Sequence, residues 1–591
     1  MSQFSRRTML GMTAAAPFSF GALAQAATPA DARFETLAKG WVDAAMRLSP
    51  VGATQTGDHR FDHEIDDLGP KGRAAVVKLA TETLAALQAT PRAELSRANQ
   101  VDAAILENQV RSDLWTTQTL QPYAWDPLVW NAVAGGALYT LTAREFAPLD
   151  VRLRSATARM EKLPALLAQA RADLVPARVP KIHADTVVGQ NKGLNSLVDG
   201  IVADAGKLPP ADRARLEAAA KTCKAAIDAH QRWLETVLVP AAKGDFRLGA
   251  ELYDAKLAFA LNSPLSRAEI KTRAQAEMTS LRATMYAISA KVLAGKPGAP
   301  PTPAAPTDAQ RQAAIEAALE FAYARKPERT KLVEAAEASL VQATAFVRER
   351  NIVTVPSDPV KIGLVPEFQR GVAVAYCDAP GPLDKGQQTY YKISPIPDDW
   401  TDAQADSFLR EYNLLGIQEV TVHEAMPGHY LQLAHANAYP SVLRAVLSSG
   451  PFVEGWACYA EDVMADEGYL GGDPLYLLVH LKLQLRVCAN ALLDQAVHVD
   501  NISRDEAMKL MTVQAFQQER EAAGKWVRAQ LSQAQLPTYF VGWEEHKALR
   551  QKAETKWGKT FTLKRYHDGI LSYGSPPARF AGQLLFDEAI A

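Results

Sequence analysis

Apolar residues recur at intervals of three and four along most of this 591-residue chain, and that periodicity restricts it to a helical architecture. Ala, Leu, Lys, Arg, Glu and Gln, which favour helices, dominate the same segments. Runs with the alternating pattern of a β-strand are few. The sequence therefore predicts an all-α, mainly helical protein with only a small β-hairpin or sheet.

The periodic segments lie on both sides of one Pro-rich stretch, residues 295–306, which has the composition of a loop. A chain of this length usually forms several domains, but the nearly continuous pattern indicates one large domain over residues 27–591. We expect two helical lobes, roughly 27–294 and 307–591, around a deep cleft. Helices are predicted over residues 30–48, 71–90, 98–119, 142–174, 208–241, 264–293, 308–325, 330–350, 402–426, 452–467, 473–498, 503–532 and 541–556.

Two short segments carry the strand pattern, residues 371–377 and 389–393, and turn-forming residues at 378–382 follow the first of them. They predict a small hairpin. Its edge could hold an extended peptide through backbone hydrogen bonds, or the hairpin could simply cover the helices. The pattern favours neither interpretation.

The stretch His423-Glu-Ala-Met-Pro-Gly-His429 carries the strongest chemical signal. Two imidazoles on one helix bind zinc, and a Glu beside the first takes a proton from the metal-bound water. The usual spacing of the two His is four residues, whereas six residues put them roughly 120° apart on a regular helix. Pro427 has no N–H for the carbonyl of His423, and Gly428 tolerates unusual backbone geometry. A widened or broken turn is therefore expected to bring His429 beside His423, with Glu424 as the base.

Glu454, twenty-five residues after His429, is the predicted third ligand. It opens the next predicted helix, and a hairpin of two helices would bring it against the His pair. Two His, one Glu and an open fourth position form a catalytic zinc site, with one Zn²⁺ per chain. The alternative is that Glu454 only stabilises the positive end of its helix.

An oxyanion-stabilising group is expected from the C-terminal third of the chain. The hydroxyl of Tyr539, between Pro537 and Gly542, could lie opposite the zinc, or it could be an ordinary core hydroxyl. His498 could face the cleft or serve as a cation at a helix C-terminus. Tyr566 is a weaker candidate.

These residues resemble a known family. The chain is similar to the bacterial family called domain of unknown function 885, which is grouped with the gluzincin metallopeptidases. The resemblance implies a gluzincin-like fold and a zinc-dependent peptidase, and it covers nearly all of the chain after residue 26. Tyr430 stands where many relatives have His, and Asn490 stands where relatives often have Arg. The matching segments are His423–Gln432, Glu454–Glu461, Thr56–Asp62, Leu536–Gly542 and Tyr566–Asp568.

The N-terminus predicts export. Arg6 and Arg7 precede an apolar run over residues 10–24, and Ala24-Gln25-Ala26 is a small-x-small cleavage site. We therefore expect a twin-arginine signal peptide over residues 1–26, cleaved after Ala26, and a periplasmic or secreted protein. Since Ala27, and not Cys, directly follows the cleavage site, no stable membrane anchor is expected.

The net charge and the cysteine count exclude two classes of protein. The chain has 64 basic and 66 acidic residues, so removing Arg6 and Arg7 leaves a net charge of −4. This argues against nucleic acid as a partner. Four Cys, at 223, 377, 458 and 488, are too few for a disulfide framework. The sequence carries no signal of an oligomeric state.

The predicted function is an exported zinc metallopeptidase that hydrolyses short or unfolded peptides. Two alternatives stay open: an inactive protein that binds metal or peptide, and a hydrolase of a non-peptide amide. Retention of Glu424 favours catalysis, because metal binding alone does not need it.

Overall fold

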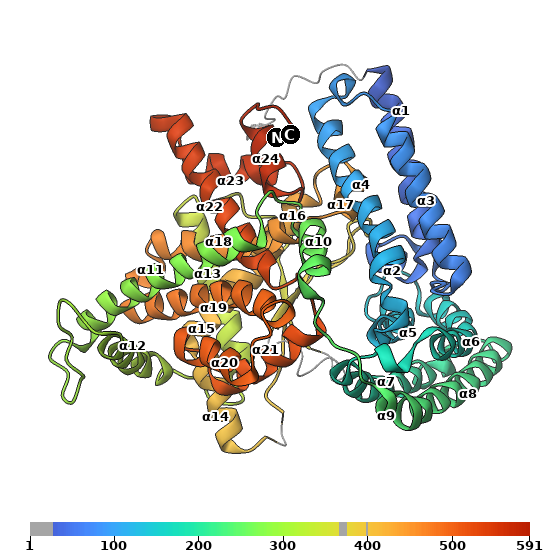
Figure 1. Ribbon diagram of the computed structural model, residues 1–591, viewed down its shortest axis with the longest axis horizontal. Coiled ribbons are helices and arrows are strands. Elements are labelled where there is room, and N and C mark those ends of the chain that lie inside the picture. The colour runs from blue at the N-terminus through green and yellow to red at the C-terminus, as the bar shows by residue number, and fades with distance from the viewer. Residues whose placement is uncertain (1–27, 366–374, 398–399, 591) are drawn as a thin grey trace, which may run out of the picture.

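The structure is a computed structural model that describes residues 28–365, 375–397 and 400–590, and it is mainly helical with one small sheet, as expected (Figure 1). We call residues 28–248 the N-lobe and the described residues from 249 to 590 the C-lobe. The N-lobe lies on the right of Figure 1. Its helices are α1 (Pro29–Leu48), α2 (Pro50–Thr56), α3 (Pro70–Gln88), α4 (Arg97–Trp115), α5 (Pro127–Thr142), α6 (Leu149–Asp173), α7 (Lys181–Ala203), α8 (Pro210–Trp233) and α9 (Val239–Ala241).

The C-lobe holds the remaining elements. They are α10 (Gly249–Leu261), α11 (Arg267–Leu293), α12 (Asp308–Tyr323), α13 (Leu332–Glu349), β1 (Lys361–Leu364), β2 (Ala375–Asp378), β3 (Tyr390–Ile393), α14 (Asp402–Glu411), α15 (Leu414–Glu424), α16 (His429–Ala436), α17 (Val442–Val446), α18 (Gly450–Asp466), α19 (Pro474–His498), α20 (Arg504–Lys509), α21 (Glu519–Leu531), α22 (Pro537–Trp557), α23 (Leu563–Leu571) and α24 (Ala578–Leu585).

Local sequence explains most helix starts. Capping boxes open α1, α11, α12, α14 and α20, each with a Ser or Thr that accepts a backbone N–H three residues on. The sequence prediction missed several helices, among them α5, α7 and α10. The residues of α5 are apolar on all sides and include Gly135 and Gly136, so that no period is visible. The expected helix 402–426 is two helices, α14 and α15, which Asn413 separates as the N-cap of the second.

The hydrophobic cores place the lobe boundary earlier than the sequence suggested. One core extends from Tyr253 to Phe586 and includes buried residues of α10 and α11. A second core occupies α5 to α9, with Val51 of α2. The expected division at residues 295–306 therefore lies within the C-lobe: this loop joins α11 to α12, which pack against each other. Composition marked the loop correctly but could not show which helices pack together.

Helix α17 anchors the C-lobe to the N-lobe. Leu443 joins the core of α1, α3 and α4. Arg444, which is 1 % exposed, pairs with Asp102 of α4 through Nε and Oδ1 at 2.7 Å, and the Ser441 hydroxyl donates to the other oxygen of Asp102. Because a buried charge is stable only when paired, this contact fixes the lobes in one arrangement.

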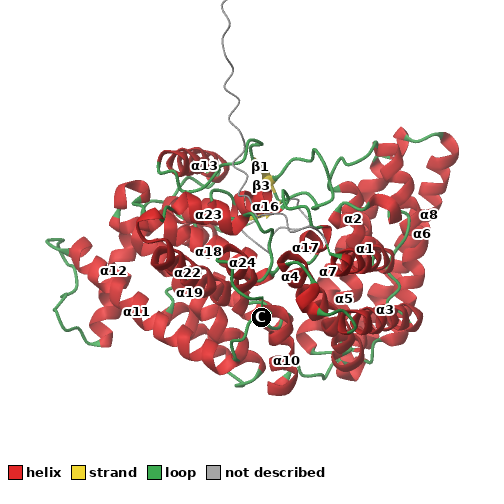
Figure 2. Ribbon diagram, turned by 90° about the horizontal axis from the view of Figure 1, so that it is seen from above, coloured by secondary structure: helices red, strands yellow, loops and turns green. Residues whose placement is uncertain are grey.

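The sheet has strand order β1-β3-β2, with β1 parallel and β2 antiparallel to β3. The predicted hairpin is present where residues 375–378 pair with residues 390–393, and its residues 371–374 lie outside the described residues. Strand β1 was not predicted, because Lys-Ile-Gly-Leu is too short to show a period. In Figure 2 the sheet lies beside α16, between the lobes.

Ionic contacts tie the sheet to the N-lobe. Arg144 donates to a carboxylate oxygen and to the backbone carbonyl of Asp378, at the end of β2. His59 lies 3.1 Å from Asp384 through Nε2 and contacts Asp62 through Nδ1. Burial alone would lower the pKa of His59, but the two carboxylates raise it. The polar segment at residues 58–64 therefore joins the lobes through His59.

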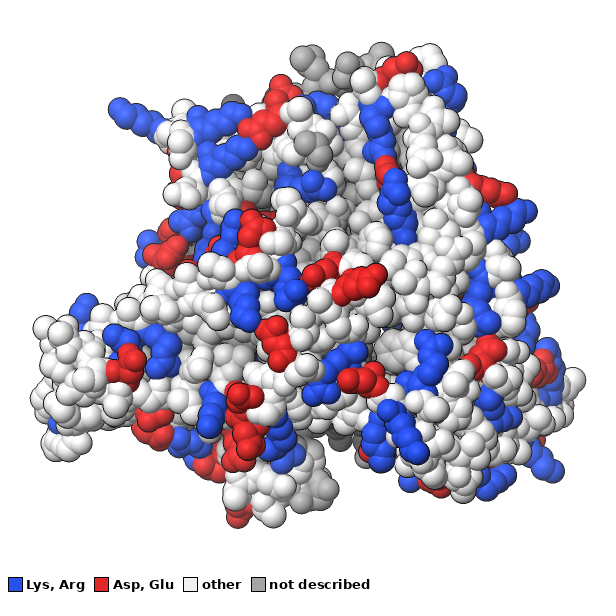
Figure 3. Space-filling view, viewed as in Figure 1, with Lys and Arg blue, Asp and Glu red and all other residues white. Residues whose placement is uncertain are grey.

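A cavity of about 300 Å³ lies where the lobes meet. Asn108 and Trp115 of α4 line one side, and Lys256 and Phe259 of α10 line another. Ser449, the N-cap of α18, closes one end. The surface around the lobes carries interspersed charges of both signs on the face shown in Figure 3. No helix within the described ranges has the length and apolar character needed to cross a membrane.

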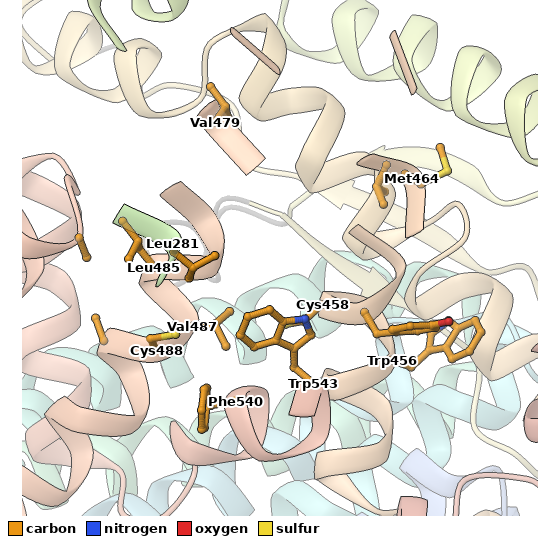
Figure 4. Close-up of a cluster of buried hydrophobic side chains, with 14 of the residues drawn as sticks. Leu281, Trp456, Cys458, Met464, Val479, Leu485, Val487, Cys488, Phe540 and Trp543 are labelled. Carbon is orange, nitrogen blue, oxygen red and sulfur yellow. The ribbon is translucent and has the colours of Figure 1, made fainter. Parts of the chain in front are cut away.

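Helices α18 and α22 cross at an unusually short distance. A Cβ built on Gly455 would lie 2.2 Å from the carbonyl carbon of Gly542, and one on Gly542 would lie 1.8 Å from the carbonyl oxygen of Pro451. The two backbones can come this close because both positions, 455 and 542, are glycine. Trp456 of α18 and Trp543 of α22 fill the space beside the crossing (Figure 4).

We predict that Gly542→Ala lowers the stability of the folded chain. A methyl group at this position overlaps backbone atoms that cannot move aside, and such overpacking costs about 1–3 kcal/mol. The midpoint of thermal unfolding, measured on metal-loaded protein, should fall. The matched control is Gly524→Ala in α21, where a Cβ meets nothing within 4 Å. That control should leave the midpoint equal or higher, since Ala favours a helix by about 1 kcal/mol over Gly. Equal effects of the two changes would contradict the prediction.

Candidate metal centre

The break between α15 and α16 occurs at the expected place. Helix α15 ends at Glu424, and α16 begins at His429. Between them the N–H of Gly428 donates to the carbonyl of Val422, six residues back, at 2.9 Å. The wide turn removes the angular offset between the two His.

Gly428 is needed in this turn because it lacks a side chain. Its backbone angles, φ −74° and ψ −130°, lie in neither the helical nor the extended region, as the sequence led us to expect. A Cβ there would also lie 1.9 Å from the carbonyl oxygen of His423 and 2.3 Å from that of Val422. The structure therefore adds a steric requirement to the unusual backbone geometry.

His423, His429 and Glu454 come together at one point, with their ligand atoms within 4.8 Å of one another. Glu454 Oε2 lies 3.7 Å from His423 Nε2 and 3.4 Å from His429 Nε2, and the two rings are nearly perpendicular. Atoms bound to a tetrahedral zinc at 2.0–2.2 Å are about 3.3–3.6 Å apart. Both the spacing and the donor types therefore fit zinc.

The helix-dipole interpretation of Glu454 fails. Helix α18 starts at Gly450 and has no acidic residue in its first turn. Burial alone would raise the pKa of Glu454, but the neighbouring imidazoles of His423 and His429 lower it well below its ordinary range. Glu454 therefore stays ionised, as a carboxylate ligand must.

Glu461 holds the first histidine, and the sequence analysis did not assign it a role. His423 Nδ1 and Glu461 Oε1 are 2.6 Å apart, and Gln484 donates to the other oxygen of Glu461. A carboxylate on the outer nitrogen of a ligating His fixes the ring and its tautomer. The spacing in the sequence could have identified Glu461, because it follows Glu454 by seven residues and so lies two turns along the same helix face.

Glu424 lies beside the centre with a different partner. One of its oxygens accepts the backbone N–H of Cys377 in β2 at 2.9 Å. Burial raises the pKa of Glu424, an effect that the charges of His429 and His423 oppose. A carboxylate with a raised pKa is better suited to accept a proton and then release it.

Of the three oxyanion candidates, only Tyr539 lies near the centre. It is half-buried in the first turn of α22, and burial together with the charge of Glu454 raises its pKa. Arg528 contacts its hydroxyl at 3.5 Å.

His498 and Tyr566 are core residues, which corrects the sequence analysis. His498 Nε2 lies 2.8 and 2.9 Å from the carbonyl oxygens of Ala529 and Ser532. The hydroxyl of Tyr566 donates to the carbonyl of His546. Both side chains are 1 % exposed or less and point into packed structure. Sequence could not distinguish them from Tyr539, because all three lie on helices.

Cys458 also lies near His423. Cys458 is 1 % exposed, and burial raises the pKa of its thiol to about 12, so without a metal the thiol is a neutral, packed group.

Comparisons with known proteins identify relatives of the whole chain. Residues 50–584 match the family described as "Bacterial protein of unknown function (DUF885)". A solved structure of a candidate lipoprotein of unknown function from Shewanella oneidensis is 33% identical, with a TM-score of 0.80 over 94% of this chain and 99% of that one. A candidate lipoprotein from Colwellia psychrerythraea is 16% identical, with a TM-score of 0.77 over 95% and 99% of the chains, and shows the shared fold alone. No curated protein sequence matches the chain.

We predict that His423→Ala lowers the zinc content of the purified protein by at least one equivalent per chain. The change removes one of three ligands and leaves Glu461 without its partner. Metal analysis after gel filtration measures the content. His435→Ala in α16 is the control, because His435 Nε2 contacts the carbonyl of Thr354 and lies outside the cluster. Unchanged zinc in His423→Ala would exclude this centre as the binding site.

Proposed function

This chain belongs to the DUF885 family, and we propose that it is an exported zinc-dependent metallopeptidase that hydrolyses peptide bonds of short or unfolded peptides. One observation carries the proposal. Two imidazoles and a carboxylate converge with metal-ligand spacing, and a second carboxylate, Glu424, lies beside them with a separate partner. A site that only binds metal does not require this additional base.

When bound, zinc would polarise the scissile carbonyl and activate water. The protein itself supplies the other functions. Glu424, oriented by the Cys377 N–H, takes the proton of the attacking water and gives it to the leaving amine. Glu461 keeps His423 in the tautomer whose Nε2 faces the centre. Tyr539 donates to the developing oxyanion.

The sheet suggests how a peptide is held. Among the described strands, in the order β1-β3-β2, strand β2 has β3 on one side only, and the N–H of Cys377 on its other side reaches Glu424. An extended peptide added to this edge would lie next to the general base, held by backbone hydrogen bonds that do not depend on sequence. This geometry favours the peptide-binding interpretation of the hairpin.

We predict that Glu424→Gln lowers the rate of peptide hydrolysis on the order of 10² or more, because the general base is lost. The variant should keep the zinc content of the wild-type protein. Zinc-loaded protein is incubated with a mixed peptide library, and products are read by mass spectrometry. The control Glu82→Gln alters an exposed carboxylate of α3 and should keep full activity. If Glu424→Gln is as active as wild type, hydrolysis does not come from this centre.

The same assay tests the alternatives. A protein that binds zinc tightly but cleaves nothing in a broad panel of peptides and amides would be a binding protein. Cleavage of amides alone would identify a non-peptide amide hydrolase.

We predict that Tyr539→Phe keeps the metal and lowers kcat by a smaller factor than Glu424→Gln, with little change in KM. The hydroxyl acts mainly on charge that develops in the transition state. Tyr566→Phe is the matched control, since its hydroxyl bonds to a core carbonyl, and it should affect stability only. A fall in kcat that is equal in both variants would remove Tyr539 from the mechanism.

We further propose that the chain uses the twin-arginine route with cleavage after Ala26. The relative from Shewanella oneidensis, described as a candidate lipoprotein, supports export. Residues 1–27 lie outside the described residues, so this proposal rests on the sequence. Changing Arg6 and Arg7 together to Lys should hold the precursor in the cytoplasm, measured by cell fractionation. Unchanged export would remove the twin-arginine route but not secretion.

A further inference from the structure

A second cluster of potential metal ligands lies in the core next to the first centre. Glu419 of α15, Glu461 of α18 and His480 of α19 present one ligand atom each within 4.8 Å of one another. Their exposed fractions are 0, 4 and 5 %. Glu419 lies one turn before His423, and Glu461 is the residue that holds His423, so the two clusters share a wall.

Two of the three residues, Glu419 and His480, have buried polar atoms without a hydrogen bond in the part of the chain that the structure describes. Both carboxylate oxygens of Glu419 and Nδ1 of His480 have no hydrogen-bond partner among the described residues. Buried polar groups are normally satisfied, and each exception requires an explanation. The exceptions at Glu419 and His480 face each other across 3.4 Å, which points to a bound group between them.

The spacing is that of metal ligands. Glu419 Oε1 lies 3.4 Å from His480 Nδ1, the same separation as Glu454 Oε2 from His429 Nε2 in the first centre. A direct ionic hydrogen bond would bring such atoms to about 2.7–2.9 Å. Ligands of one metal ion are instead about 3.3–3.6 Å apart.

The outer nitrogen of His480 is supported in the way a ligating histidine requires. Its Nε2 lies 3.2 Å from Asp462 Oδ1, and Asp462 accepts the indole N–H of Trp543. A carboxylate on one nitrogen directs the lone pair of the other toward a metal. The arrangement repeats that of Glu461 on His423.

Helix α19 adds further unsatisfied oxygens on the same face. Tyr476 and Gln484 lie one turn before and one turn after His480. Within the described ranges, the Tyr476 hydroxyl, which faces Glu419, and Gln484 Oε1 have no hydrogen-bond partner within normal distance. Glu419, Glu461 and Asp462 bring three carboxylates to this region. Among the described residues, Glu419 forms an ion pair with His480 alone. A surplus of buried acceptors and negative charge is stabilised by a cation.

We propose that Glu419, Glu461 and His480 bind a second divalent metal ion, distinct from the catalytic zinc. Its ligand set of one imidazole and two carboxylates suits a first-row ion such as Zn²⁺ or Mn²⁺. Each oxygen of Glu461 has two lone pairs, so this carboxylate can hold His423 Nδ1–H and also contact the second ion. The second ion thereby fixes Glu461, and through it the orientation of His423.

The test uses the full chain loaded with Zn²⁺ and freed of excess metal by gel filtration. Metal analysis should give two equivalents per chain. Glu419→Gln should give one equivalent, and crystals of the wild-type protein should show two zinc anomalous peaks, one of them among Glu419, Glu461 and His480. Glu411→Gln is the matched control, because Glu411 is an equally buried carboxylate that pairs with Lys482 and should keep both ions.

The outcomes separate this proposal from the catalytic one. The proposal is overturned if the wild-type protein holds one equivalent of zinc and shows no anomalous peak at the second cluster. A shared proton or a buried water between these groups would then explain their spacing. Two equivalents in Glu419→Gln also overturn it. If Glu419→Gln does not fold, the anomalous peaks of the wild-type protein decide alone. Because these measurements read metal and not hydrolysis, a protein without peptidase activity can still support the second site.

Discussion

The centre depends on a turn in which the backbone of Gly428 lies directly against the carbonyl of His423. This contact closes the six-residue spacing of the two histidines. The indole N–H of Trp456 then donates to the carbonyl of Pro427 at 2.9 Å and joins the turn to α18, which carries Glu454. Helix α18 meets α22 through Gly455 and Gly542, so the first turn of α22, with Tyr539, is positioned by the same chain of contacts. Tight backbone packing thus sets the relative positions of four side chains on four separate helices: His423, His429, Glu454 and Tyr539.

The N-lobe acts on the centre from a distance. Arg144 holds Asp378, and the adjacent residue Cys377 donates its N–H to Glu424. The position of Glu424, the proposed general base, therefore depends on how the N-lobe holds the end of β2. The buried pair of Arg444 and Asp102 keeps the lobes together at α17. These contacts join the two lobes to one site.

Electrostatics around the centre follow from burial. Carboxylates at Glu419, Glu454 and Glu461 are removed from water, and each needs a positive partner, because an isolated buried charge costs several kcal/mol. The imidazoles of His423, His429 and His480 provide part of that compensation, and the metal ions that we propose would provide the rest. Glu424 differs from these carboxylates, since its raised pKa and backbone partner suit proton transfer instead of charge pairing.

The sequence by itself determined the helical class, most helix positions, the loop at residues 295–306 and the residues that converge in the first centre. Each of these features depends on residues close together in the sequence: a repeat of apolar positions, a helix cap or a short motif. Tertiary structure alone decided that α10 and α11 pack in the C-lobe, that a third strand joins the sheet, and that His498 and Tyr566 are core residues. It also decided that Glu461 holds His423. The physical reason is that periodicity gives the face of each helix, whereas the pairing of faces depends on contacts between residues hundreds of positions apart.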